Sequence, residues 1–91
     1  MLLIRRVKGK SMEPYAYDGQ ILVALRRKSF QRGQFVVFQH EGRQKLKKVA
    51  KLRNNSDLYV VGLNDAYSTD SRDYGWISAG AVMGVVIWPR L

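Results

Sequence analysis

The sequence contains no cysteine and only one histidine, His40. Disulfide bonds and thiolate metal sites are therefore excluded, and a site with several histidine ligands cannot be built. We expect neither a metal nor another cofactor. A Ser-His-Asp triad would have to use His40, which follows a predicted strand and precedes the turn residues Glu41-Gly42.

Acidic residues are also scarce. Only 7 Asp and Glu stand against 16 Lys and Arg, which gives a net charge of +9. Such an excess suggests an anionic partner, such as nucleic acid, a membrane surface or an acidic protein. It is equally typical of a basic surface with no dedicated partner, so charge alone does not choose a function.

Long hydrophobic runs are missing as well. The longest apolar stretch, Ala79 to Pro89, falls far short of the roughly 20 residues that a membrane helix needs. Met1–Ile4 is too short for the core of a signal peptide, and Arg5 and Arg6 follow it. We expect a soluble, cytoplasmic chain without a membrane span, although a protein that had lost an anchor would show the same pattern.

Strand signals dominate what is present. The 91 residues fit a single domain, 1–91, and no window shows a convincing helical period. Turn pairs such as Asp18-Gly19 and Arg32-Gly33 separate short runs rich in β-branched and aromatic residues. These runs are Gln20–Leu25, Gln34–Gln39, Lys45–Leu52, Leu58–Val61 and Val82–Trp88. The pattern predicts a small all-β domain that is mostly antiparallel and resembles a partly closed barrel.

Two glycine-bounded segments, 9–19 and 62–75, do not read as strands and are dense in reactive side chains. In the first, Ser11 lies between Gly9 and Glu13-Pro14. A turn of this kind can expose a hydroxyl and direct backbone N–H groups at a neighbouring oxyanion. A serine in such a turn is more often an ordinary turn residue. In the second segment, Asp70 and Arg72 are close enough to pair.

A serine nucleophile needs a base, and lysine is the alternative to His40. The lysine pKa must then fall by several units from about 10.4, through burial or a neighbouring cation. The run Lys45–Lys51 interleaves lysines with apolar residues. Strand alternation places Lys48 with Leu46 and Ala50 on the more apolar face, so periodicity alone selects Lys48 as the buried lysine.

Taken together, these segments resemble the signal peptidase I group of serine–lysine peptidases, which is related to the self-cleaving LexA-type repressors. The resemblance runs through nearly the whole chain in the family's order. The matching motifs are Gly9-Lys10-Ser11-Met12-Glu13-Pro14, Asp18-Gly19, Arg32-Gly33 before Phe35–Phe38, Leu46-Lys47-Lys48-Val49, Gly62–Gly75 and Val82–Val86. The family's usual Gly-Asp-Asn is Gly62-Leu63-Asn64 here, and its Lys-Arg pair is Lys47-Lys48.

The resemblance implies Ser11 as the nucleophile and Lys47 as the general base. It further implies that Ser68 hydrogen-bonds the lysine amine and that the backbone N–H of Ser11 forms the oxyanion hole. Gly9 stands where some relatives have a hydroxyl for that hole. Lys48 remains the alternative base.

The same resemblance implies supporting roles for three other residues. Met12 would help to shape the substrate pocket beside the nucleophile. Asp70 and Arg72 would form a structural pair that pins the loop 62–75.

The resemblance also suggests a substrate. Typical signal peptidases carry a membrane anchor and often an additional β insertion, and this sequence shows neither. With ten residues before Ser11, it looks most like the small maturation proteases of nickel-type superoxide dismutase. Those enzymes remove a short N-terminal extension, and the segments Asp70–Gly75 and Gly84-Val85-Val86 look like that subgroup. The expected partner is a precursor protein with a cleavable N-terminal extension.

Three alternatives remain open. The chain could be the core of a membrane-type signal peptidase I that lacks its anchor, or a LexA-type self-cleaving domain, which needs a cleavable segment ahead of Ser11. It could also be a basic β module for single-stranded nucleic acid that stacks bases on Tyr15, Tyr17, Phe35 and Phe38. Such aromatic residues more often pack in a core or pocket, so we do not expect a nucleic-acid partner.

Overall fold

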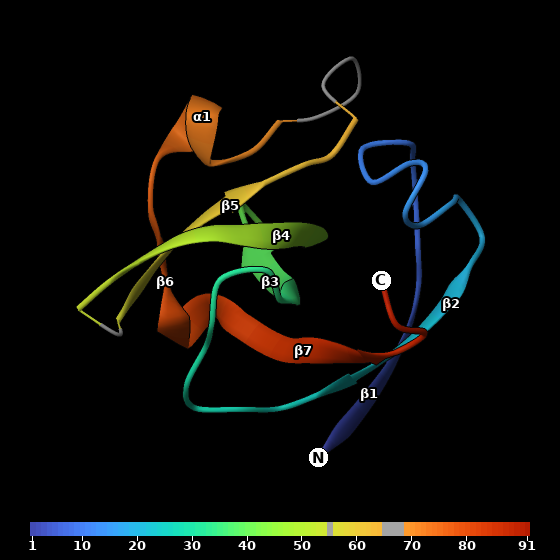
Figure 1. Cartoon of the computed structure of the whole chain (residues 1–91), viewed down its shortest axis with the longest axis horizontal. Helices are drawn as coiled ribbons and strands as arrows, with labels where there is room; N and C mark the ends of the chain where they lie inside the picture. Colours follow the sequence, from blue (N-terminus) through green and yellow to red (C-terminus); the bar gives the residue numbers. More distant parts are fainter. Residues whose placement is uncertain (55, 65–68) are drawn as a thin grey trace.

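The structure, a computed structural model, describes residues 1–54, 56–64 and 69–91. Strands dominate these residues (Figure 1). They are β1 (Leu2–Arg6), β2 (Ile21–Leu25), β3 (Phe35–His40), β4 (Arg43–Arg53), β5 (Asp57–Val61), β6 (Ile77–Ser78) and β7 (Val82–Trp88). Two short helical segments complete the described elements, α1 (Ser71–Tyr74) and the 3-10 turn η2 (Ala79–Ala81).

All five strands predicted from the sequence are confirmed, as β2, β3, β4, β5 and β7. The sequence pattern did not predict β1, because the apolar residues of β1 do not alternate with polar ones, or β6, which has two residues. It also missed α1, a single turn held by a capping box between Asp70 and Asp73. In the part of the chain that the structure describes, no helix has the length and apolar character to cross a membrane.

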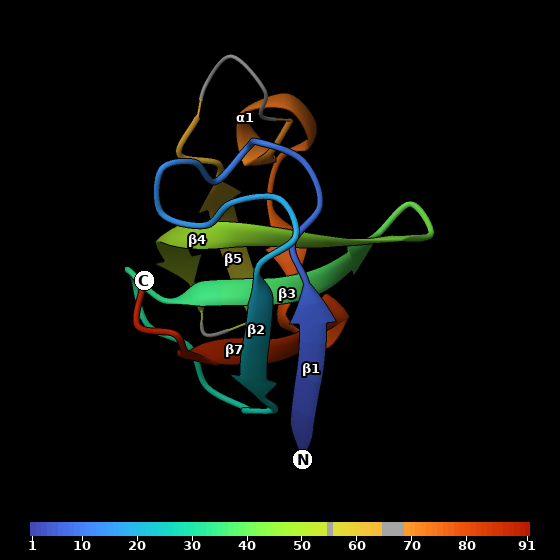
Figure 2. The same cartoon turned by 90° about the vertical axis from the view of Figure 1, so that its right-hand side faces the viewer.

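The strands form one antiparallel sheet in the order β1-β2-β7-β3-β4-β5-β6. The predicted all-β, mostly antiparallel domain is therefore confirmed, and its sheet bends over without closing. Figure 2 shows β1 and β2 running across β3, β4 and β7. This bend brings the end of β1 and the segment after it to the first half of β4, where Arg5 contacts Gln44.

Irregularities in the pairing allow the bend. The register shifts between Val23 and Ala24 where β2 meets β7, and between Val37 and Phe38 where β3 meets β7. Bulges of this kind bend a strand and increase its twist. At Gly84 the layers come so close that a Cβ atom would lie 3.0 Å from the Ala24 Cβ and 3.2 Å from Leu3 Cδ1. A larger residue there would push β7 away from β1 and β2.

The same kind of irregularity overturns the prediction that Lys48 is the buried lysine of β4. Lys47 and Val49 are buried, whereas Lys48 is only partly so. The register shifts between Val49 and Lys51, after which Leu52 lies opposite the buried Leu58. The inward face thus changes from odd to even residues at the bulge, and an alternation read along the whole strand assigns Lys47 to the wrong face.

Buried side chains form two clusters. The larger lies among β3, β4, β5 and β7 and contains Phe30, Val36, Phe38, Val49, Leu58, Val60, Ile77, Val82 and Val85. The smaller contains Val7, Met12, Ala16, Leu22 and Phe35. Because Met12 and Ala16 come from the segment that carries Ser11, the second cluster fastens that segment to the sheet.

Candidate active site

A cleft of about 740 Å³ separates the N-terminal segment from β4. Ser11 and Lys47, the two catalytic residues expected from the resemblance, both line it. Ser11 lies in a turn after β1, and Lys47 lies at the middle of β4. Among the described residues, the lining is formed by Arg5, Arg6, Val7, Lys8, Gly9, Lys10, Ser11, Met12, Leu22, Val37, Arg43, Gln44, Lys45, Leu46, Lys47 and Thr69.

Backbone hydrogen bonds close the segment 7–20 into a compact loop. The Val7 N–H donates to the Gln20 carbonyl, and the Gly19 N–H donates to the Val7 carbonyl, both at 2.8 Å. The Gly9 N–H donates to Asp18 Oδ1 at 2.8 Å, with Gly9 at a φ of 85° that other residues adopt only under strain. Gly9 is thus required by the shape of the turn that presents Ser11.

The carbonyl oxygen of Ser11 accepts two hydrogen bonds from a distant part of the chain. The N–H groups of Leu63 and Asn64 donate to it at 2.9 Å and 2.8 Å. These bonds orient the peptide unit that follows Ser11. The segment after β5 therefore positions the serine turn directly.

Asp70 and Arg72 fix the position of Gly62, the residue just before Leu63 and Asn64. Arg72 donates from Nε to Asp70 Oδ1 at 3.0 Å and from Nη2 to Oδ2 at 2.8 Å, a two-point ion pair. Asp70 Oδ2 also accepts the Gly62 N–H at 2.6 Å, and Arg72 Nη2 donates to the Gly62 carbonyl at 3.4 Å. The side chain of Asp70 is fully buried, so its contacts form a rigid link between α1 and Gly62.

Burial shapes the electrostatics of Lys47, whose residue is 4% exposed. Removal from water lowers the pKa of its amine from the usual lysine value, and the positive charges of Lys45 and Arg72 lower it further. The carboxylates of Asp70 and Asp73 act in the opposite direction, but the net direction is downward. A lowered pKa increases the neutral fraction of the amine, the form that can accept a proton.

The two rival bases lie elsewhere. The Lys48 amine lies 5.9 Å from the centre of the Phe35 ring, and Lys48 does not line the cleft. His40 stacks on Tyr74 with ring centres 4.0 Å apart, and its Nε2 lies 3.2 Å from a Glu41 carboxylate oxygen. His40 is likewise not among the residues that line the cleft.

Two other expected site residues have different outcomes. Met12 lines the cleft but is 1% exposed, because it packs in the smaller core cluster. Its side chain can form the floor of a pocket. Ser68 lies outside the described residues, and its neighbour Thr69 lines the cleft.

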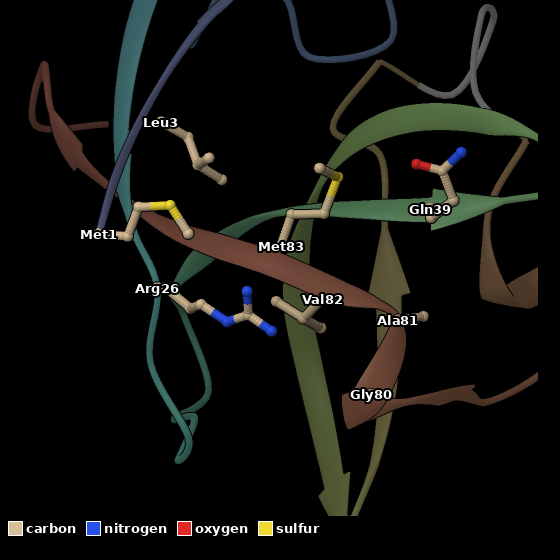
Figure 3. A pocket seen from close by; sticks show the side chains of 8 residues that line it. All are labelled: Met1, Leu3, Arg26, Gln39, Gly80, Ala81, Val82 and Met83. Carbon is tan, nitrogen blue, oxygen red and sulfur yellow. The ribbon is translucent and has the colours of Figure 1, made fainter.

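A smaller hollow of about 310 Å³ lies at the other end of β1 (Figure 3). Its lining consists of Met1, Leu3, Arg26, Gln39, Gly80, Ala81, Val82 and Met83. It contains neither Ser11 nor Lys47. The larger cleft is therefore the candidate active site.

A comparison with protein families matches residues 2–87 to the peptidase S24-like family. This chain belongs to the peptidase S24-like family. No curated protein matches it at a level that indicates a relative. Membership of the S24-like family supports a peptidase of the serine type, and it agrees with the coarse relationship to LexA-type proteins drawn from the sequence motifs.

One wall of the cleft was not predicted from the sequence. Arg5 and Arg6 reach it because β1 forms an edge of the sheet beside the serine turn. Arg5 Nε donates to Gln44 Oε1 at 2.6 Å, which joins β1 to β4 across the cleft. The available signal was the pair of arginines that ends two residues before Gly9-Lys10-Ser11.

Proposed function

We propose that this chain is a serine endopeptidase in which Ser11 is the nucleophile and Lys47 is the general base. The observation that carries the proposal is the placement of both residues on one cleft, with the lysine amine buried and its pKa lowered. A buried lysine without a catalytic or structural task would be costly, so its position at the cleft supports a role in proton transfer.

The reaction follows from these groups. The neutral Lys47 amine takes the hydroxyl proton of Ser11 as Oγ attacks the scissile carbonyl carbon. The backbone N–H of Ser11 donates to the oxyanion of the tetrahedral intermediate, and Ser68 orients the amine. Protonated Lys47 then gives its proton to the leaving amine as the peptide bond breaks. The acyl-enzyme is hydrolysed when the amine activates a water molecule in the same way.

The strand pairing supports binding of the substrate in an extended form. On β4, pairing with β3 covers Arg43–Lys48, whereas the described pairing with β5 begins at Lys48. The edge of residues 43–47 that points away from β3 is therefore not paired with β5, and these five residues line the cleft. A peptide could add there as a strand, with backbone hydrogen bonds supplying affinity and the pocket above Met12 selecting small side chains.

We infer that the substrate is a precursor protein whose N-terminal extension is removed, with nickel-type superoxide dismutase as the candidate. The inference rests on the motif resemblance of Asp70–Gly75 and Gly84-Val85-Val86. Incubation of the candidate precursor with purified protein should yield one new N-terminus by mass mapping. Ser11→Ala and Lys47→Arg should yield none. Equal cleavage by Ser11→Ala would contradict the mechanism.

Self-cleavage is the second candidate, because the matching family model is S24-like. In the described structure, the residues just before the serine turn form β1 and pair with β2. They are not seated in the cleft as a substrate. A cleavage rate that does not depend on protein concentration would favour self-cleavage, whereas a rate proportional to enzyme concentration would favour a separate precursor. Preferential cleavage of membrane-inserted signal peptides would instead favour a membrane-type signal peptidase core.

A further inference from the structure

The charge of the cleft is one-sided. Seven of the described residues that line it have basic side chains, namely Arg5, Arg6, Lys8, Lys10, Arg43, Lys45 and Lys47, and none of these lining residues is Asp or Glu. The whole sequence has 16 Lys and Arg, so almost half of them surround this one cleft. We propose that the cleft selects acidic peptides, with Asp or Glu close to the scissile bond. This inference rests on the proposed function.

The cations are divided between two walls. Arg5 and Arg6 come from β1, and Lys8 follows them in the serine segment. Arg43 and Lys45 come from β4 on the other side. A peptide lying between the walls would therefore meet positive charge on both flanks. Clefts lined by one sign of charge concentrate the field and accelerate the association of oppositely charged ligands.

The spacing along β4 predicts where the acidic residues lie. Arg43, Lys45 and Lys47 alternate along the strand and so share one face. With a rise of about 3.3 Å per residue, Lys45 lies about 7 Å from Lys47 along the strand, and Arg43 about 13 Å. An extended substrate has nearly the same repeat. Its side chains two and four residues from the scissile bond should therefore face Lys45 and Arg43.

Several of the acidic side chains already contact other groups of the protein. Asp70 pairs with Arg72, Asp57 with Arg53, and Glu41 lies against His40. Asp18 accepts the Gly9 N–H. The described lining residues thus carry an excess of positive charge that an acidic peptide complements. Arg43 is also exposed, so its guanidinium can form a two-point contact with a carboxylate.

The test uses two Ala-rich peptides that differ only in Glu or Gln at the second and fourth positions on each side of a small-residue cleavage site. At low salt, the Glu peptide should have a kcat/KM about tenfold higher than the Gln peptide, and the advantage should shrink at high salt. The Arg43→Glu/Lys45→Glu variant should prefer the Gln peptide. The matched control is Arg27→Glu/Lys28→Glu, which makes the same charge change at exposed residues outside the cleft and should keep the preference for Glu.

A binding measurement separates this inference from the proposed catalysis. Fluorescence anisotropy of the labelled peptides with Ser11→Ala should show tighter binding of the Glu peptide. Equal cleavage of the two peptides by wild type, or an unchanged preference in Arg43→Glu/Lys45→Glu, would overturn the acidic specificity and leave the peptidase intact. Charge-dependent binding without any cleavage would overturn the peptidase proposal instead. A single-stranded oligonucleotide of equal charge that binds more tightly and displaces the Glu peptide would also overturn peptide selection.

Discussion

Lys47 on β4 lies directly opposite Val36 on β3, and the two residues are 4% and 0% exposed. An amine in such surroundings loses most of its hydration, which disfavours its charged form. Burial makes a charged Lys47 costly to the folded state. The same burial favours the neutral amine, which is the form that the base of the proposed dyad requires.

Activity should rise with pH as the Lys47 amine loses its proton. Only the neutral amine accepts the Ser11 proton, and its lowered pKa places the rise below the value of about 10.4 for a free lysine. Lys47→Arg should be inactive, because an arginine does not deprotonate in this range. The matched Lys48→Arg should retain its activity and its pH profile. An inactive Lys48→Arg together with an active Lys47→Arg would assign the base to Lys48, and two active variants would direct attention to His40.

Lys47→Met should change how stability depends on pH. Because the folded pKa is below the unfolded one, the unfolded chain binds more protons, and wild-type stability rises with pH up to the ordinary lysine pKa. A methionine of similar length has no such term. The melting temperature of Lys47→Met relative to wild type should therefore be highest near neutral pH and decline as pH rises. Lys48→Met is the control, and a constant difference across this pH range would show that the Lys47 pKa is not lowered.

Ser11→Ala should remove proteolysis while leaving the fold intact. Loss of a nucleophile typically reduces kcat by several orders of magnitude. The turn is held by backbone bonds to the Ser11 carbonyl, which alanine keeps, so the melting temperature should change little. Circular dichroism and single-turnover assays would measure both effects. A Ser11→Ala variant that cuts as fast as wild type would exclude Ser11 as the nucleophile.

Asp70→Ala should destabilise the protein more than Arg72→Ala. Removing the buried carboxylate takes away the acceptor of the Gly62 N–H and the two-point ion pair of Arg72, at a cost of about 3 kcal/mol. Arg72→Ala leaves the carboxylate with the Gly62 bond and should cost about 1–2 kcal/mol. Arg53→Ala, which breaks a more exposed pair with Asp57, is the control and should cost less than about 1 kcal/mol. Equal melting temperatures for Asp70→Ala and Arg53→Ala would contradict the role of Asp70 as a structural link.

Small side chains should be preferred just before the scissile bond. The floor of the cleft at Met12 is buried and fixed in the smaller core cluster, so it cannot withdraw to admit a bulky residue. Profiling with a peptide library would measure the preference. Met12→Ala should enlarge the pocket and admit a larger side chain. A wild-type preference for bulky or charged residues at that position would argue against the pocket.

The sequence was most informative where its signal was local. The turn around Ser11 and the runs that became β2, β3, β5 and β7 follow from glycines and β-branched residues that act over a few positions. The burial of Lys47 could not be predicted in that way, because it depends on a bulge whose position is set by pairing with β5. The motif resemblance selected Lys47, the lysine that is buried, where alternation favoured Lys48. A family motif can mark such a position because it reflects the packing of the whole fold. The wall formed by Arg5 and Arg6 was missed because β1 reaches the cleft only through the bend of the sheet.

The bonds from Leu63 and Asn64 to the Ser11 carbonyl also bear on the order in which the protein matures during synthesis. Ser11 leaves the ribosome before Lys47, and Leu63 and Asn64 follow later still. Contacts between segments so far apart in the chain form only after the intervening strands have paired. Under the proposed mechanism, the growing polypeptide would therefore carry Ser11 in a turn that is not yet held, and it would lack its base until β4 has been made. Proteolysis by the nascent chain would have to wait until residues 63 and 64 have joined the serine turn.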